Sequence, residues 1–209
     1  MTLDLFFTTI AGAMKQFDAG MLLAVNGLNT PWLDQIMWVV TNRFAWIPLY
    51  VALALYIVRL DWRKGLMCLA FIGLLILAVD QTIASLIRPL VGRLRPSWDT
   101  AMFGDSLHLV NGYRGGMYGF PSCHGANSFA LSTFIILYLR TRHAAIAMTL
   151  WALLHAGSRV YLGVHYPGDI FVGALIGIGY AFLFYRLMTF SARMLPQFLQ
   201  STGGVRIAS

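Results

Sequence analysis

Five apolar runs, separated by short charged or polar segments, dominate the chain. They cover residues 44–58, 65–79, 125–139, 144–156 and 170–185. As a helix, each run covers roughly 22 Å at 1.5 Å per residue, whereas the hydrocarbon core of a bilayer is roughly 30 Å thick. We therefore expect five transmembrane helices that continue through their polar flanks, as the run 65–79 does through Asp80 to Ile87.

The N-terminal residues 1–43 are also apolar, but polar and helix-breaking residues interrupt them, among them Asp18, Asn26, Asn29, Pro31 and Asp34. This pattern favours short amphipathic helices on a membrane interface. A sixth span is the alternative. The expected fold class is thus all-α: a polytopic membrane helix bundle of about five transmembrane helices plus N-terminal interfacial amphipathic helices.

Composition excludes several other classes of protein. Hydrophobic residues make up 58% of the 209 residues and charged residues only 11%, against roughly 25% charged in soluble domains. With a mean hydropathy of +0.69, the chain is unlike disordered chains, coiled coils and basic nucleic-acid-binding domains. The net charge of +7 favours anionic lipid head groups as the counter-charge. We therefore expect membrane lipids, and no nucleic acid, as partners.

The distribution of Lys and Arg predicts the orientation in the membrane. The connections 59–64 and 140–143 and the tail beyond residue 185 hold eight of them, and the opposite side holds seven. Three of those seven, Arg88, Arg95 and Arg159, belong to the functional motifs described below and say little about topology. The positive-inside rule then places the 59–64 connection in the cytoplasm. The long connection 88–121 is expected to face outward.

Three polar segments meet the outward surface in this topology, at residues 88–96, 121–124 and 158–169. Together they bring Arg88, Arg95, Arg159, Ser122 and two histidines to one membrane surface. Guanidinium groups match the oxygens of a phosphate and keep their charge at physiological pH. The pattern therefore predicts an anion site of phosphate type.

The two histidines differ in setting. His165 and Asp169 are four residues apart, so both lie on one helical face and the carboxylate can accept the proton of one ring nitrogen. The other nitrogen is then free to act as a nucleophile. His124 precedes the apolar run 125–139, where helix-start amides favour an anion, and it is placed to give a proton to a leaving oxygen.

Other polar residues have simpler explanations. Arg93 is expected to contact lipid head groups, and His155 to be a packing residue with no direct role. Asp80 is expected to form an internal ion pair with an arginine. Tyr161 and Tyr166 are expected to be aromatic anchors at the membrane interface.

The order Arg-x6-Arg-Pro, Pro-Ser-x-His and Ser-Arg-x5-His-x3-Asp, at the ends of apolar runs, resembles the type 2 phosphatidic acid phosphatase family, the membrane lipid-phosphate phosphatases. The resemblance runs from about residue 44 to about residue 185. It implies that His165 forms a phosphohistidine, that Asp169 orients it, and that His124 protonates the leaving group and then activates water. It also implies a metal-independent hydrolase without a cofactor, in which the phosphoryl oxygens are held by Arg88, Arg95, Arg159, Ser122 and backbone amides near Cys123.

Two positions depart from the family pattern. Arg88 stands where the family usually has lysine, which keeps the charge but replaces an ammonium by a planar fork. Cys123 stands where the family usually has glycine, and its side chain is expected to crowd the backbone approach to phosphate. Cys123 is not expected to be a nucleophile itself, because position 129 holds Phe129 rather than the arginine of cysteine phosphatases.

The sequence thus predicts N-terminal interfacial helices (1–43), a catalytic transmembrane domain (44–190) and a cytoplasmic tail (191–209). The expected location is an inner membrane, with the active site toward the periplasm or cell exterior. By analogy with small members of the family that the chain resembles, undecaprenyl diphosphate is the leading substrate hypothesis, with lipid A 1- or 4'-phosphate and phosphatidylglycerophosphate as alternatives. Two other classes remain open: a vanadium-dependent haloperoxidase, which the apolar runs disfavour, and a non-catalytic anion- or lipid-binding membrane protein. The sequence leaves the oligomeric state open.

Overall fold

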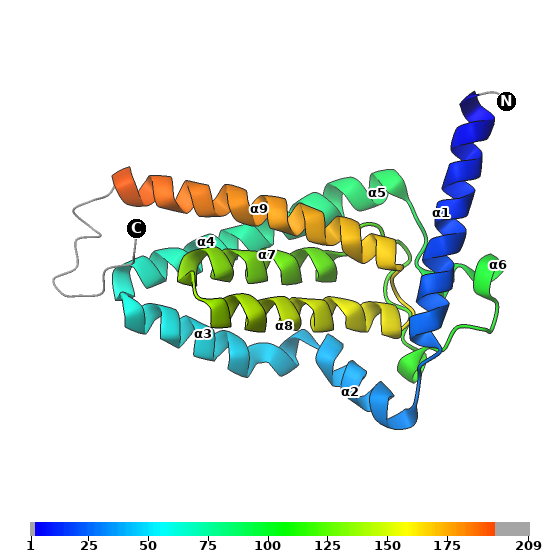
Figure 1. Ribbon diagram of the computed structural model, residues 1–209, viewed down its shortest axis with the longest axis horizontal. Helices are drawn as coiled ribbons and strands as arrows, with labels where there is room; N and C mark the ends of the chain where they lie inside the picture. Colours follow the sequence, from blue (N-terminus) through cyan, green and yellow to red (C-terminus); the bar gives the residue numbers. More distant parts are fainter. Residues whose placement is uncertain (1–2, 195–209) are drawn as a thin grey trace.

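The computed structural model describes residues 3–194 and is all-α within that range, apart from one isolated β-bridge between Leu94 and Tyr118. Five long helices run side by side along the molecule (Figure 1). They are α3 (Ile47–Leu60), α4 (Trp62–Gln81), α7 (Cys123–Leu139), α8 (Arg142–Tyr161) and α9 (Pro167–Met194). The runs 65–79, 125–139, 144–156 and 170–185 lie within α4, α7, α8 and α9, and the run 44–58 lies mostly in α3, which confirms the predicted helices. Most of the predicted tail, residues 195–209, lies outside the described residues.

Within residues 3–194, three segments are long and apolar enough to cross a membrane: Arg43–Leu60, Trp62–Val91 and Pro167–Met194. The first joins the 3₁₀ turn η1 (Arg43–Trp46) to α3. In the second, α4 continues through a π-helical segment, η2 (Thr82–Ile87), into α5 (Arg88–Val91). This segment carries Arg88 to the end of the bundle, as the predicted extension of the run 65–79 requires. α7 is apolar but shorter, and we assign α7 and α8 as spans from their place in the bundle.

Glycines allow the central helices α7 and α9 to approach closely. A Cβ atom at Gly173 or Gly177 would collide with the backbone of α7 at Ser122 or Ala126. Two small residues four apart on one face are a common device for close helix packing in membranes. Because this contact lies near the start of both helices, it brings the first turn of α9 beside Ser122.

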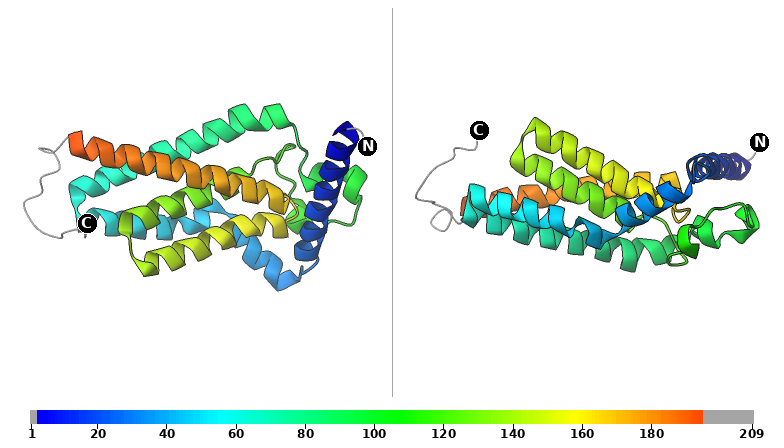
Figure 2. Two further views of the ribbon diagram at one scale, coloured as in Figure 1. Left: turned by 45° about the horizontal axis from the view of Figure 1, so that its top comes forward. Right: turned by 90° about the horizontal axis from the view of Figure 1, so that it is seen from below.

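The N-terminal region forms α1 (Leu3–Asn26) and α2 (Pro31–Thr41). Instead of the short helices predicted, α1 is one helix of 24 residues, and it crosses the end of the bundle (Figures 1 and 2). Its face toward the protein buries Asp18, Leu22 and Asn26, while Met14 and Phe17 are exposed. α1 is not among the candidate spans, and an outward apolar face suits a helix lying on an interface.

The connection between α5 and α7 lies at the same end of the molecule as α1 (Figure 2). It contains three short helical segments, η3 (Pro96–Trp98), α6 (Thr100–Phe103) and η4 (Val110–Gly112). The α3–α4 and α7–α8 turns lie at the opposite end. Tyr161 and Tyr166 are buried beneath α1, α2 and this connection, so their prediction as interface anchors was wrong.

Candidate active site

The three polar segments singled out in the sequence meet at the end of the bundle covered by α1. Arg88 lies at the start of α5, Arg95 and His165 lie in connections, and Arg159 lies in the last turn of α8. Ser122 caps α7, whose first two residues are Cys123 and His124, and Asp169 lies in the first turn of α9. Because the ends of four helices converge here, each contributes a side chain without a break in the bundle.

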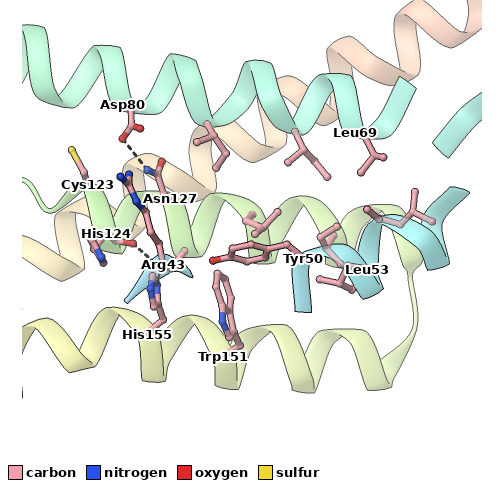
Figure 3. Close-up of a pocket in the computed structure, with 17 residues that line it drawn as sticks. Arg43, Tyr50, Leu53, Leu69, Asp80, Cys123, His124, Asn127, Trp151 and His155 are labelled. Atoms are coloured by element: carbon pink, nitrogen blue, oxygen red, sulfur yellow. Dashed lines mark hydrogen bonds between the residues drawn. The ribbon is translucent and has the colours of Figure 1, made fainter. Parts of the chain in front are cut away.

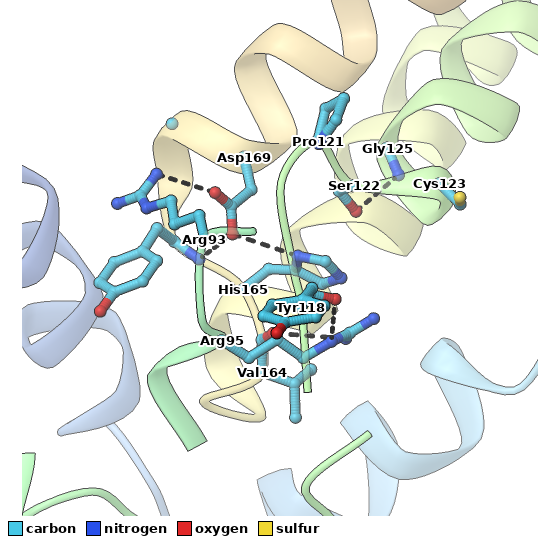
Figure 4. A network of polar contacts seen from close by, with 12 residues as sticks. Arg93, Arg95, Tyr118, Pro121, Ser122, Cys123, Gly125, Val164, His165 and Asp169 are labelled. Carbon is cyan, nitrogen blue, oxygen red and sulfur yellow. Dashed lines mark hydrogen bonds and ion pairs between the residues drawn. The ribbon is translucent and has the colours of Figure 1, made fainter. Parts of the chain in front are cut away.

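His165 and Asp169 form a buried pair (Figure 4). The Nδ1 atom of His165 lies 3.3 Å from Oδ2 of Asp169, and the two residues are 1% and 0% exposed. The same carboxylate oxygen accepts a hydrogen bond from the backbone N–H of Tyr166 at 3.1 Å. A carboxylate in this position fixes the proton on Nδ1 and leaves Nε2 unprotonated.

Positive charge surrounds this pair. Burial, followed by the charges of Arg95 and Arg159, holds the pKa of the His165 imidazole well below its usual 6.5. Burial, followed by the charges of Arg159 and Arg88, lowers the pKa of the Arg95 guanidinium to about 10. At neutral pH His165 is therefore an uncharged base facing cations, which is the arrangement that a histidine nucleophile for an anionic substrate requires.

Arg95 is held in place by backbone carbonyls and is 7% exposed. Its Nε atom donates to the carbonyl of Tyr118 at 3.2 Å, and Nη1 donates to the carbonyl of Val164 at 3.4 Å. These neutral acceptors position the guanidinium without neutralising it. Its charge is therefore available to an anion.

Arg88 contacts the start of α7. Its Nη2 atom donates to the carbonyl of Pro121 and to Sγ of Cys123, each at 3.2 Å. Ser122 accepts a hydrogen bond from the N–H of Gly125 at 3.2 Å, and its own N–H donates to the backbone carbonyl of Asp169 at 3.0 Å. Ser122 thus caps the helix and ties α7 to α9, while the Cys123 thiol contacts the Arg88 fork.

Arg159 and His124 are joined by a residue that the sequence did not single out. Arg159 donates from Nη1 to Oγ1 of Thr41 at 2.8 Å, and Nε2 of His124 lies 3.3 Å from the carbonyl oxygen of the same residue. A carbonyl can only accept, so Nε2 of His124 carries a proton. Tyr113 is a second missed residue, because its hydroxyl accepts from Arg159 Nη2 at 3.3 Å.

The contacts of Arg93 differ most from those that the sequence predicted. Its Nη1 atom lies 2.8 Å from Oδ1 of Asp169, its Nη2 atom lies 2.7 Å from Oδ2 of Asp18, and its guanidinium stacks on the ring of Tyr166. Asp18 also accepts the N–H of Gly168 at 2.7 Å. Arg93 therefore links α1 to the partner of His165, and the expected contact with lipid head groups was wrong.

We expect Arg93→Gln to lower kcat by up to about 10²-fold, because the carboxylate that aligns His165 loses one of its supports. KM should change much less, since Arg93 contacts Asp18 and Asp169 rather than the three arginines expected to bind phosphate. Arg93→Lys should restore part of kcat. Arg114→Gln is the matched control, because Arg114 contacts Ser97 and Trp98 within the outward connection. Equal losses in the two glutamine variants would contradict a positioning role.

The predicted roles of His155 and Asp80 can also be compared with the structure. His155 packs as expected, stacked between the rings of His124 and Trp151 with centroid distances of 5.1 and 5.3 Å. Asp80 accepts a hydrogen bond from Nδ2 of Asn127 at 2.8 Å, so an amide takes the place of the expected arginine. In residues 3–194 no three His, Cys or Asp side chains are grouped to hold a metal ion.

Comparisons with known proteins identify the family that the chain resembles. The family model of the PAP2 superfamily matches residues 66–193. The chain is 43% identical to the lipid A 4'-phosphatase of Bacteroides thetaiotaomicron, over 90% of this chain and 82% of the relative. It is 28% identical to the lipid A 4'-phosphatase of Porphyromonas gingivalis, over 84% and 75% of the two chains.

A solved structure shares the fold. The transmembrane PAP2-type phosphatidylglycerolphosphate phosphatase of Bacillus subtilis superposes with a TM-score of 0.59 at 24% identity, over 92% of this chain and 95% of that one. Its likeness confirms the membrane helix bundle, and the family model covers more than half of the chain. The chain therefore belongs to the PAP2 superfamily and is a membrane phosphatase.

Proposed function

We propose that the protein removes the 4'-phosphate from lipid A at the outward face of an inner membrane. The buried His165–Asp169 pair facing three arginines carries the phosphatase assignment. The choice of lipid rests on the 43% identical relative, which covers most of both chains. This relative favours the lipid A alternative over undecaprenyl diphosphate, the leading hypothesis from the sequence.

In the proposed mechanism, Arg88, Arg95 and Arg159 hold the phosphoryl oxygens, together with Ser122 and amides near Cys123. Nε2 of His165 attacks phosphorus, and the bond from phosphorus to the sugar oxygen breaks. Nε2 of His124 gives its proton to that oxygen. His124 then takes a proton from water, which attacks the phosphohistidine and releases phosphate. This sequence matches what phosphoryl transfer requires, which is positioning and stabilisation of charge.

The proposed orientation follows from the charges and from the bundle. The turns at 59–64 and 140–143 lie at one end, and the arginine-lined site lies at the other. The positive-inside rule assigns the former end to the cytoplasm. We propose that residues 1–43 form the interfacial part and residues 44–190 the catalytic domain. Two contacts join these parts: Asp18 pairs with Arg93, and Thr41 accepts a hydrogen bond from Arg159.

The substrate assignment is tested by phosphate release from a panel of lipids. The purified protein in detergent, with a chelator present, is given lipid A, undecaprenyl diphosphate, phosphatidylglycerophosphate and phosphatidate. We expect lipid A to give the highest kcat/KM, with loss of the 4'-phosphate rather than the 1-phosphate, as read by mass spectrometry. Faster release from undecaprenyl diphosphate would return the assignment to that lipid, and release from none would contradict the proposal.

His124→Ala tests the acid role. General acid catalysis contributes roughly 10² to 10⁴-fold, and the contribution falls when the leaving oxygen needs no proton. We expect a large loss of kcat for lipid A and a much smaller loss in the phosphorylation step for p-nitrophenyl phosphate. His143→Ala is the control, because His143 is exposed at the opposite end. An equal penalty on both substrates would contradict the acid role.

A further inference from the structure

Asp18 lies on the face of α1 that packs against the end of the bundle, and it is 9% exposed. Its Oδ2 atom lies 2.7 Å from Nη2 of Arg93, and its Oδ1 atom accepts the N–H of Gly168 at 2.7 Å. Nη1 of the same guanidinium lies 2.8 Å from Oδ1 of Asp169, the oxygen that His165 does not contact (Figure 4). Arg93 thus joins two carboxylates, one from α1 and one from the active site.

The charges around His165 give the second carboxylate a use. Attack on phosphorus turns the imidazole into a cation, and the three arginines of the site already place positive charge around it. The carboxylate of Asp169 compensates this charge, but a guanidinium on its other oxygen weakens that compensation. With Asp18 present, the group formed by the two carboxylates and Arg93 carries a net negative charge. Asp18 therefore keeps Asp169 effective as the partner of a histidine that becomes charged.

We propose that Asp18 is a positioning residue for the phosphatase reaction and acts through Arg93 on Asp169. It touches none of the groups that are proposed to contact the substrate, so its effect falls on the chemical step. The inference rests on the proposed function and extends the machinery to α1. This helix lies outside residues 66–193, the part of the chain that the family model matches.

The surroundings of Asp18 hold it in one geometry. A Cβ atom at Gly168 would lie 2.8 Å from Oδ2 of Asp18, so a residue without a side chain allows the carboxylate to approach this N–H closely. The guanidinium of Arg93 lies 4.0 Å from the ring centroid of Tyr166, and this ring belongs to the same buried cluster as Leu22 of α1. Because Asp18 binds both the arginine and the backbone beside Asp169, α1 fixes the side chain and the start of α9 together.

This network lies apart from the space beside His124. A cavity of about 600 Å³ lies between α3, α4, α7 and α8, and Cys123 and His124 line one end of it (Figure 3). Among the described residues, none from α1 lines this cavity, and neither do Arg93 and Asp169. A change at Asp18 should therefore slow the reaction without altering the walls of the cavity.

Asp18→Asn tests the proposal because it removes the charge and keeps the shape. Its amide oxygen can still accept from Gly168, whereas its NH₂ group faces the Nη2 donor of Arg93. We expect kcat for phosphate release from lipid A and from p-nitrophenyl phosphate to fall about tenfold or more. KM and the inhibition constant of inorganic phosphate should stay within about twofold, because the three arginines proposed to bind phosphate are unchanged.

Lys15→Gln is the matched control. Lys15 also joins α1 to the outward connection, through an ion pair of 3.3 Å with Asp99, but this pair does not include Asp169. The control should keep kcat within about twofold of the wild type. A double-mutant cycle with Arg93→Gln then separates positioning from a general loosening of α1. In the Arg93→Gln background, Asp18→Asn should lower kcat by less than about twofold further, since its partner is gone.

Other results would overturn the inference. Unchanged kcat in Asp18→Asn, a similar loss in Lys15→Gln, or fully additive losses in the double mutant would each refute the positioning role. A parallel rise in KM and in the inhibition constant of phosphate would show a structural role instead. If Asp18→Asn fails to fold, Asp18→Ser takes its place with the same criteria. A wild type that releases phosphate from neither substrate would refute the proposed function and this inference with it, whereas an active wild type matched by Asp18→Asn would refute this inference alone.

Discussion

Replacing His165 by asparagine is expected to lower kcat by about 10⁴-fold or more, since the step that forms the covalent intermediate loses its nucleophile. Asparagine is the informative choice because its amide nitrogen takes the place of Nδ1 beside Asp169, while nothing takes the place of Nε2. His165→Gln makes the opposite change, since its amide nitrogen takes the place of Nε2. Both variants should be inactive, because an amide nitrogen is not nucleophilic. The readout is phosphate release from lipid A in detergent.

The fold should survive this change. His165 is fully buried, so an alanine would leave a cavity, whereas asparagine keeps a hydrogen bond to the carboxylate. His108→Gln is the matched control, because Nε2 of His108 lies 2.8 Å from Oδ2 of Asp34 at the same end of the molecule, and the glutamine amide nitrogen takes the place of that atom. It should keep near wild-type turnover. Substantial phosphatase activity in a folded His165→Asn protein would refute the nucleophile assignment.

Asp169→Asn is expected to lower kcat by about 10³- to 10⁴-fold, the size of effect seen when a triad aspartate becomes an amide. The carboxylate accepts from His165 on one oxygen and from Arg93 on the other. An amide has only one acceptor, so either the imidazole loses the partner that fixes its tautomer or Arg93 faces an N–H group. Either outcome disturbs the position of Nε2.

Kinetic measurements on Asp169→Asn and on a control variant test whether Asp169 orients His165. Asp34→Asn is the control for Asp169→Asn, because it alters the corresponding pair with His108. We expect little change of kcat in the control. The loss in Asp169→Asn should lie in kcat rather than KM, because the three arginines proposed to bind phosphate are untouched. Comparable losses in the two variants, or a loss confined to KM, would contradict the orienting role.

The sequence was sufficient to predict the five helices of the bundle and the convergence of the three motifs at one end of it. Membrane spans depend on local hydropathy, so the five apolar runs predicted α3, α4, α7, α8 and α9 without knowledge of their packing. His165 and Asp169 are four residues apart, and this spacing alone predicts that they contact one another. The three motifs also lie at helix ends, which the topology places at one face.

The sequence could not predict contacts between segments that lie far apart in the chain. The Arg93–Asp18 ion pair joins residues 75 positions apart, and it depends on α1 crossing the end of the bundle. Thr41 contacts Arg159 from 118 positions away. An arginine at a membrane surface usually contacts lipid, and a threonine in an apolar region carries no signal. The burial of Tyr166 has the same cause, because α1 and the outward connection cover it.

A phosphohistidine at His165 is the intermediate that the proposed mechanism requires, and trapping it is the most direct test of that mechanism. His124→Ala should still be phosphorylated by p-nitrophenyl phosphate, which needs no acid, but it lacks the base that activates water. Radiolabelled phosphate should therefore remain on the protein after a basic quench, be lost in acid, and map by mass spectrometry to His165. Label on Ser122 or Cys123, or turnover without any labelled enzyme, would contradict the account.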